Sequence, residues 1–140
     1  MDQKNQYVAL VLACIDPRMQ EPVYKYLEKR NLTGKYSQVV IAGAAIGAVA
    51  PRFEEWHQTF WQNLGISVGL HKIHKVIVIQ HRDCGAAREA YGDFTPGSEH
   101  ETNLHRTTLA DFRNQLLKHQ PQLDVETLLM DLDGSIEDLS

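Results

Sequence analysis

Two apolar runs constrain the fold of this 140-residue chain more than any other feature. Residues 7–13 read Tyr-Val-Ala-Leu-Val-Leu-Ala, and residues 75–80 read Lys-Val-Ile-Val-Ile-Gln. Neither run alternates between apolar and polar residues, as a strand with one face in water would do. Strands of a parallel sheet are covered by helices on both faces and lack that alternation. The two runs therefore predict buried strands of a parallel sheet.

The segments around these runs predict alternating helices and strands. Helical spacing and end signals predict helices at about residues 19–32, 52–70, 85–91 and 98–118. Further short strands are expected at residues 38–41 and 126–131, and residues 42–50 form a stretch of small residues to which no element is assigned. After a turn at Asp133-Gly134, the last residues are expected to form an acidic tail.

This alternation predicts an α/β fold with a mostly parallel sheet of four to five strands, in the order 2-1-3-4, flanked by helices. A chain of 140 residues is long enough for one hydrophobic core. We therefore expect residues 1–140 to form a single α/β domain.

Three details of the helices can be predicted from the spacing. In the second helix, core packing is the simpler expectation for the aromatic residues, but Trp56 and Trp61 lie toward opposite edges, so a contact of one of them with a second subunit is the alternative. Ser98 followed by Glu101 is the signature of a capping box. In the helix after it, the residues expected to face inward are Leu104, Thr108, Phe112, Leu116 and Leu117.

The two cysteines of the chain both follow the apolar runs. Cys14 comes directly after the first run, and His81 and Cys84 come after the second. In a sheet of order 2-1-3-4, strands 1 and 3 are neighbours, and their carboxyl ends meet where the strand order reverses. Two thiols and an imidazole at one place suit Zn²⁺, and three protein ligands leave the open fourth position typical of catalytic zinc.

Other interpretations of these residues remain open. Cys14 and Cys84 can be small buried side chains, with His81 as a residue of the turn. The spacing is not Cys-x-x-Cys, so a thioredoxin-like redox role has little support.

Asp16 and Arg18 follow Cys14 at intervals of two and four residues. A guanidinium can hold a carboxylate by two hydrogen bonds, and a carboxylate held beside a zinc site can accept a proton from a bound water. The alternative is an acidic residue at the first turn of a helix, with Arg18 on the surface.

The charge and hydropathy of the chain argue against some partners. The net charge is −4 and the basic residues are scattered, whereas nucleic-acid binding needs clustered Lys and Arg. No apolar run approaches the roughly 20 residues of a membrane span, and residues 1–6 are polar. We expect a cytoplasmic protein with reduced thiols and without a membrane or nucleic-acid partner.

The motif pair Cys14-x-Asp16-x-Arg18 and His81-x-x-Cys84-Gly85 resembles that of the β-class carbonic anhydrases. The likeness covers roughly residues 7–92 and 126–136. It implies reversible hydration of CO₂ to bicarbonate and a proton at a Zn²⁺ ion held by Cys14, His81 and Cys84. It also implies that Asp16 and Arg18 orient the reacting groups, and that Asp16 can take the fourth zinc position in an inactive state. The expected assembly is a homodimer or a higher homo-oligomer with the pocket near a subunit boundary.

The sequence departs from that family at two places near the motifs. Residues 41–45 are apolar where the family has a polar segment with a basic residue, and Pro17 stands where serine is usual. The apolar wall expected from this segment consists of Ile41, Ala44, Ala45 and Ile46. A more apolar pocket keeps two alternatives open: hydrolysis of COS or CS₂ at the same zinc site, and a non-catalytic zinc-binding regulatory domain.

Two auxiliary roles have candidates in the sequence. The histidines considered as proton relays are His57, His100 and His105, because an unperturbed pKa near about 6.5 suits proton transfer. The nearest candidates for a glutamine of the β-class family are Gln6 and Asn5.

Overall fold

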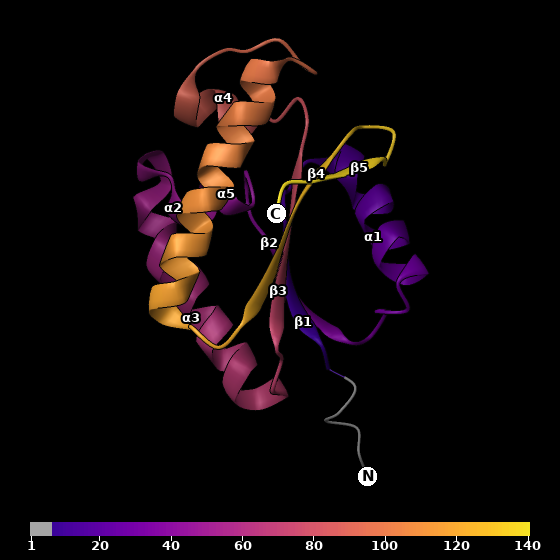
Figure 1. Ribbon diagram of the computed structural model, residues 1–140, viewed down its shortest axis with the longest axis vertical. Helices are drawn as coiled ribbons and strands as arrows, with labels where there is room; N and C mark the ends of the chain where they lie inside the picture. Colours follow the sequence, from indigo (N-terminus) through magenta and orange to yellow (C-terminus); the bar gives the residue numbers. More distant parts are fainter. Residues whose placement is uncertain (1–6) are drawn as a thin grey trace.

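A five-stranded sheet in the order β2-β1-β3-β4-β5 forms the centre of the protein (Figure 1). The structure is a computed structural model and describes residues 7–140. Four strands are parallel, and the fifth runs antiparallel to its neighbour. The strands are β1 (Ala9–Ala13), β2 (Tyr36–Val40), β3 (Lys75–His81), β4 (Asp124–Met130) and β5 (Ile136–Asp138). The predicted α/β class and the predicted order of the first four strands are confirmed.

Strands β1 and β3 lie side by side in the middle of the sheet. Ala9 pairs with Lys75 and Ala13 with Ile79, so both strands end at nearly the same level. Every residue of β1 is buried, and so is every residue of β3 after Lys75. The absence of alternation in the sequence therefore has a physical cause, because both faces of these strands are covered.

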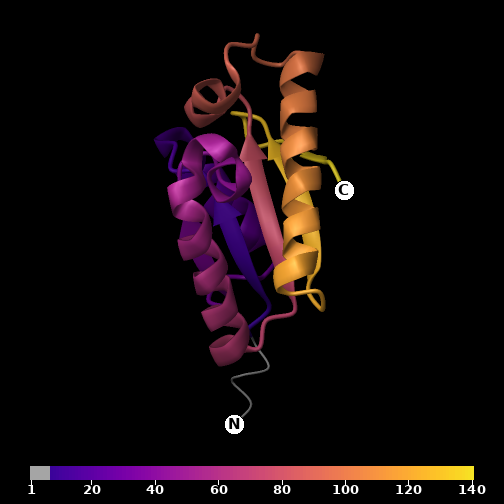
Figure 2. The same cartoon turned by 90° about the vertical axis from the view of Figure 1, so that its left-hand side faces the viewer.

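Helices cover the two faces of the sheet unequally. One face carries α1 (Gln20–Lys29), which follows a 3₁₀ turn at Pro17–Met19. The other face carries α3 (Glu54–His71) and α5 (Glu99–His119), which lie side by side, with the short α2 (Ala45–Val49) beside them (Figures 1 and 2). A second 3₁₀ turn at Pro51–Phe53 leads into α3. Helix α4 (Gly85–Tyr91) lies beyond the carboxyl end of β3 (Figure 1).

Successive residues of β1 contribute to two separate cores, because side chains alternate between the faces of a strand. Val11 packs under α1, next to Val23 and Leu27. Leu10 and Leu12 pack on the opposite side against a cluster that includes Phe60, Trp61, Leu64, Phe112 and Leu116. Within residues 7–140, no helix is both long enough and apolar enough to span a bilayer.

Two expectations about local structure were wrong in detail. The small-residue stretch contains the helix α2, whose five residues are all buried, because small side chains let its backbone approach the sheet and α3 closely. Leu117 is 61% exposed. It lies one residue beyond the buried Leu116, and a rotation of about 100° per residue turns it away from the core. Thr108, Phe112 and Leu116 are buried as predicted, and the buried face of α5 also includes His105 and Leu109.

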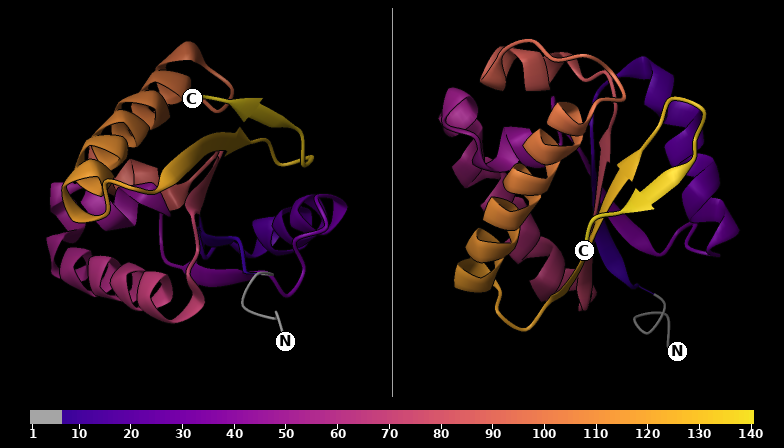
Figure 3. Two further views of the ribbon diagram at one scale, coloured as in Figure 1. Left: turned by 60° about the horizontal axis from the view of Figure 1, so that its bottom comes forward. Right: turned by 45° about the horizontal axis from the view of Figure 1, so that its top comes forward.

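The C-terminal residues form more than an acidic tail. After the turn at Asp133-Gly134 the chain reverses and pairs as β5 with the end of β4 (Figure 3). Ile136 packs against the core under α1, and Leu139 packs against the core on the opposite face. These two apolar residues at intervals within an acidic segment account for the ordered pairing.

Candidate metal centre

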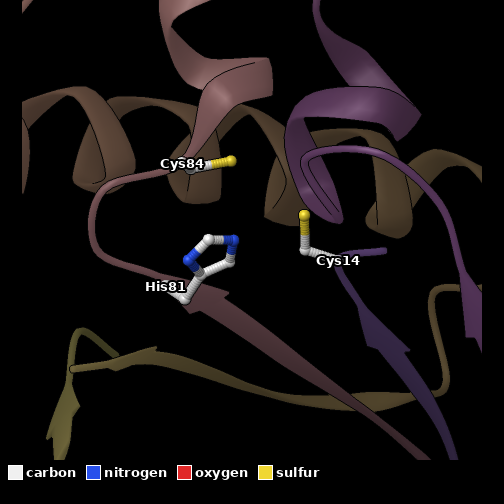
Figure 4. A group of neighbouring side chains, drawn as sticks. All are labelled: Cys14, His81 and Cys84. Atoms are coloured by element: carbon white, nitrogen blue, oxygen red, sulfur yellow. The ribbon is translucent and has the colours of Figure 1, made fainter. Parts of the chain in front are cut away.

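The loops after β1 and β3 bring the predicted ligands together. Cys14 follows the last residue of β1, His81 ends β3, and Cys84 precedes α4. One ligand atom from each of the three residues lies within 4.8 Å of the other two. Figure 4 shows both sulfur atoms and the imidazole ring directed into one space. His81 and Cys84 are buried, and Cys14 is partly buried.

The hydrogen bond of His81 sets which ring nitrogen faces the sulfur atoms. Nδ1 lies 2.7 Å from the carbonyl oxygen of Arg82. A carbonyl only accepts, so Nδ1 carries the proton and the neutral ring has its lone pair on Nε2. Nε2 is buried and has no hydrogen-bond partner among the described residues. A metal ligand in a protein has this arrangement, with one ring nitrogen fixed by a hydrogen bond and the other free for the ion.

The two thiols shift each other's pKa in opposite directions. The neighbouring Cys84 thiol lowers the pKa of Cys14 well below its usual value, against the effect of burial, and His81 and the backbone N–H of Gly43 add to the lowering. The Cys14 thiolate and burial together raise the pKa of Cys84. Metal ions bind cysteine as the thiolate, so binding to both sulfur atoms releases any proton that they carry and is pH-dependent.

The donor set suits zinc. Two sulfur atoms and a neutral imidazole match a Cys₂His zinc site with one open position. Both cysteines are free, with no disulfide between them. The cluster of Cys14, His81 and Cys84 is thus consistent with a zinc site, and the unpartnered Nε2 of His81 gives independent support from the structure itself.

Asp16 and Arg18 form a bidentate pair beside this cluster. Arg18 Nε lies 3.1 Å from Asp16 Oδ1, and Nη2 lies 2.7 Å from Oδ2. These contacts lower the pKa of Asp16 to about 2. Asp16 Oδ2 is also 3.8 Å from His81 Nε2, so the carboxylate reaches the edge of the ligand space. The backbone N–H of Arg18 binds Asp16 Oδ1 at 2.9 Å, which makes Asp16 the cap of the 3₁₀ turn as well.

Gln80 was not singled out from the sequence, yet it organises the loop over the site. Its Oε1 accepts a hydrogen bond from the backbone N–H of Ala45 at 2.7 Å, and its Nε2 donates to the carbonyl of Gly43 at 2.9 Å. Nε2 also lies 3.3 Å from Nδ1 of His105. The sequence does contain a signal for this role, because Gln80 is a polar residue near the end of an otherwise apolar strand.

Glu101 was recognised only as part of a capping box, and it does more than cap α5. Its backbone N–H does bind Ser98 Oγ, at 3.1 Å, as predicted. Its fully buried carboxylate accepts hydrogen bonds from Arg82 Nη1, Gly97 N and Asp83 N at 3.0, 2.7 and 2.6 Å. Glu101 therefore fixes the loop that carries His81 and Cys84.

A pocket of about 410 Å³ opens at the cluster, and most of its lining is apolar. Its lining residues are Cys14, Ile15, Asp16, Pro17, Ala42, Gly85 and Ala86. The predicted wall was therefore misplaced. Ala44, Ala45 and Ile46 are fully buried in the core, and Ile41 lines a neighbouring pocket instead. Small residues after a strand were taken for a surface, but they form the buried helix α2 and its first turn.

The histidines considered as relays differ in their environments. His105 is fully buried, and burial lowers its pKa to about 4, which does not suit transfer to solvent at neutral pH. His57 donates from Nε2 to the carbonyl of Ala50 at 2.9 Å, and His100 is exposed. Gln6 and Asn5 lie outside the described residues.

Comparison with known families identifies the family of this chain. The sequence profile of a family described as "Putative carbonic anhydrase" matches residues 4–140. The chain belongs to this carbonic anhydrase family. Two of its relatives are uncharacterized proteins of Rickettsia. One, from Rickettsia bellii, is 30% identical over 136 residues, which are 96% of this chain and 83% of the relative. The other, from Rickettsia conorii, is 29% identical over 136 residues, 96% of this chain and 73% of the relative.

Solved structures with the same fold are β-carbonic anhydrases. CafA of Aspergillus fumigatus superposes with a TM-score of 0.59 at 14% identity, over 95% of this chain and 75% of that one. A β-carbonic anhydrase of Sordaria macrospora, described as tetrameric, gives a TM-score of 0.58 at 14% identity, over 96% and 81%. The β-carbonic anhydrase CcaA gives 0.58 at 12% identity, over 95% and 79%. At these identities the likeness establishes a shared fold.

Proposed function

We propose that this protein is a zinc-dependent carbonic anhydrase that interconverts CO₂ and bicarbonate. The observation that carries the proposal is the convergence of three ligand atoms within 4.8 Å, with the Asp16 carboxylate 3.8 Å from one of them. Cys14, His81 and Cys84 would hold the ion, and Asp16 and Arg18 would act beside it. A Zn²⁺ ion bound there would lower the pKa of a water ligand from about 15.7 to about 7 and so supply a nucleophile at neutral pH.

The residues of the chain prepare the site for this reaction in three ways. Arg18 holds the Asp16 carboxylate ionised and fixed in direction by two hydrogen bonds. Asp16 Oδ2 can then accept a hydrogen bond from a donor in the ligand space, which orients the lone pairs of that donor. The backbone N–H of Gly43 stabilises the Cys14 thiolate from the other side.

The pocket supports a small, uncharged substrate. Ile15, Pro17, Ala42 and Ala86 contribute apolar side chains to its lining, and Asp16 contributes a carboxylate. A linear, apolar molecule loses little hydration on entering such a pocket.

Stopped-flow CO₂ hydration of zinc-loaded protein, measured across pH with zinc content determined on the same sample, tests the proposal. We expect a turnover well above background that rises from acidic to alkaline pH. Protein that carries zinc but does not accelerate hydration at any pH would overturn the proposal and favour a non-catalytic zinc-binding regulatory domain.

The apolar mouth also favours a second candidate, hydrolysis of COS or CS₂ at the same site. These molecules are linear and uncharged like CO₂, and the lining of the pocket contains no side chain that distinguishes oxygen from sulfur. Sulfide release measured in parallel with CO₂ hydration separates the two functions. Sulfide release without CO₂ hydration would establish the second candidate and exclude the first.

We also propose that the protein forms a homodimer through the edge of its sheet. Within residues 7–140, strand β2 pairs with β1 alone, so its other edge is available. Next to this edge, three large apolar side chains are exposed: Ile15 at 60%, Val40 at 44% and Trp56 at 40%. They line a groove of about 420 Å³, and Ile15 directly follows the ligand Cys14. Analytical ultracentrifugation should show a dimer, and a monomer at micromolar concentration would contradict this assembly.

A further inference from the structure

We propose that Asp83 is a positioning residue that joins the two metal-ligand loops through Arg18 and so assembles the site before an ion binds. The inference concerns the same site as the proposed function. It adds a residue, Asp83, that lies between His81 and Cys84 in the sequence and had no role assigned from it.

Arg18 is shared between its own loop and the loop after β3. Besides its two bonds to Asp16, it donates from Nη1 to Asp83 Oδ2 at 3.0 Å and from Nη2 to the Asp83 carbonyl at 3.0 Å. Asp16 is two residues from Arg18, so that pair alone links nothing distant. The contacts with Asp83 span 65 positions of sequence and connect the loop of Cys14 to the loop of His81 and Cys84.

The remaining polar groups of Asp83 bind partners other than Arg18. Its backbone N–H binds the buried carboxylate of Glu101 at 2.6 Å, and its second carboxylate oxygen accepts from Arg88 Nη1 at 2.8 Å. Its backbone has a positive φ of 59°, which Asp tolerates better than most residues. This conformation lets the N–H bind Glu101 while the carbonyl and carboxylate bind Arg18.

Arg88 is itself held in place on α4. Its guanidinium carbon lies 4.3 Å from the centroid of the Phe94 ring, and the guanidinium also bonds to Asp83. Asp83 therefore has one fixed partner on each side, Arg88 on α4 and Glu101 on α5. Arg18, with 48% of its side chain exposed, is the least buried member of this group, and the Asp83 carboxylate ties it to the loop after β3.

The consequence is a preorganised ligand set. Cys14 is on one loop and the other two ligands are on the second, so their spacing depends on how the loops are held relative to each other. If Asp83 no longer held Arg18, the strands would still fix Ala13 and His81, but the residues beyond them would lose their direct link. The ion would then leave more easily.

A simpler role for Asp83 is that of an acidic partner for Arg88 near the start of α4. That role predicts that substitution of Asp83 lowers the stability of the protein. It also predicts that the effect of the substitution on zinc release is the same with and without Arg18. A double-mutant cycle distinguishes the two, because residues that act through one contact have non-additive effects.

The experiment measures zinc release from the full-length, zinc-loaded protein into an excess of a chromogenic chelator. We expect Asp83→Gly, which accepts the positive φ and keeps the carbonyl contact, to release zinc about 10- to 100-fold faster. Asp83→Asn, which leaves one acceptor oxygen, should give an intermediate rate. Arg18→Ala should release zinc as fast as Asp83→Gly, and the double variant should be no faster than either.

Two controls match these variants. Asn31→Gly places glycine at another position with a φ of 59°, in the exposed loop after α1, at the opposite end of the sheet. Glu89→Gln breaks the exposed ion pair with Arg52, at 3.1 Å, without touching the site. Both should release zinc at the wild-type rate. The absorption spectrum of the cobalt(II)-substituted protein gives a second readout, which should change in Asp83→Gly and remain unchanged in the controls.

Release at the wild-type rate from both Asp83 variants would overturn the inference, as would additive effects of Asp83→Gly and Arg18→Ala. Neither result depends on turnover. A wild-type protein that holds zinc without hydrating CO₂ would instead refute the proposed function and leave the role of Asp83 standing.

Discussion

The backbone N–H of Gly43 donates a hydrogen bond to Sγ of Cys14 over 3.3 Å. This contact brings a third segment, the loop after β2, to a site whose ligands come from the loops after β1 and β3. Gly43 has a positive φ of 79°, and a Cβ placed on it would lie 2.9 Å from Cβ of Ile46 and 3.0 Å from Cβ of Ala86. The loop can approach the thiolate because this position has no side chain.

Gly43→Ala is therefore expected to lower the free energy of unfolding by about 2–4 kcal/mol, because overpacking and an unfavourable φ act together. Gly97→Ala is the matched control. Its φ is 83°, but nothing lies within 4 Å of the added Cβ, so only the backbone cost of about 1–2 kcal/mol applies. Urea denaturation of both variants measures the difference, and equal losses would contradict the steric account.

Gln80→Leu should destabilise the protein by about 2–5 kcal/mol, because it leaves the buried backbone groups of Gly43 and Ala45 without their hydrogen bonds. Gln62→Leu, on the exposed face of α3, should change stability by less than about 0.5 kcal/mol. Thermal and urea unfolding check both values. A Gln80 variant as stable as the wild type would show that the loop after β2 does not depend on this side chain.

The central part of this structure could be predicted from local sequence. The apolar runs of β1 and β3 identified buried parallel strands, and neighbouring strand ends placed Cys14 near His81 and Cys84. Both steps depend on periodicity and on the order of strands, which a single sequence shows. The apolar helix faces were predicted for the same reason, apart from Leu117, whose hydrophobicity was misleading.

The residues around the ligands could not be predicted in this way. Asp83, Glu101 and Gln80 act through hydrogen bonds to segments distant in sequence, and their partners are often backbone groups that carry no sequence signal. The same holds for α2, whose small residues gave no helical pattern because all of them are buried. The three candidate ligands were thus more visible in the sequence than the residues that hold them in place.

Glu126 links stability to pH at the end of the sheet opposite the site. It binds Arg30 at 2.7 Å and Lys75 at 2.9 Å, and these contacts, Arg30 first, lower its pKa to about 2. A lowered pKa stabilises the folded protein above the unfolded pKa of about 4.3, and this contribution is lost as the pH falls toward 2. Glu126→Gln should lose on the order of 1–2 kcal/mol at pH 7, after allowance for solvent screening, and little at pH 2.

Urea unfolding of wild type and Glu126→Gln between pH 2 and 7 measures this linkage. The difference in unfolding free energy between the two proteins should shrink as the pH falls below about 4.3. If this difference stays constant between pH 2 and 7, the ion pairs of Glu126 are not the cause of the lower stability of the variant.

Asp16→Asn should lower CO₂ hydration about 10- to 100-fold without loss of zinc, because the carboxylate orients a reacting group and is not among the three ligands. Since the pKa of Asp16 is about 2, the residue is ionised at every working pH, and the acidic limb of the wild-type rate profile should not follow its titration. Asp111→Asn, on the exposed face of α5, is the control. A stopped-flow rate of Asp16→Asn equal to that of the wild type would show that Asp16 takes no part in the mechanism.

The most direct test of the whole account is the zinc content of the purified protein, measured by plasma emission spectrometry alongside His81→Ala. We predict one zinc ion per wild-type chain and a loss of most of it in a folded His81→Ala variant, because the unpartnered Nε2 of His81 is a ligand. A folded wild-type protein that takes up no zinc when supplied with it, or a His81→Ala variant that retains the full amount, would contradict the proposal that Cys14, His81 and Cys84 bind one ion.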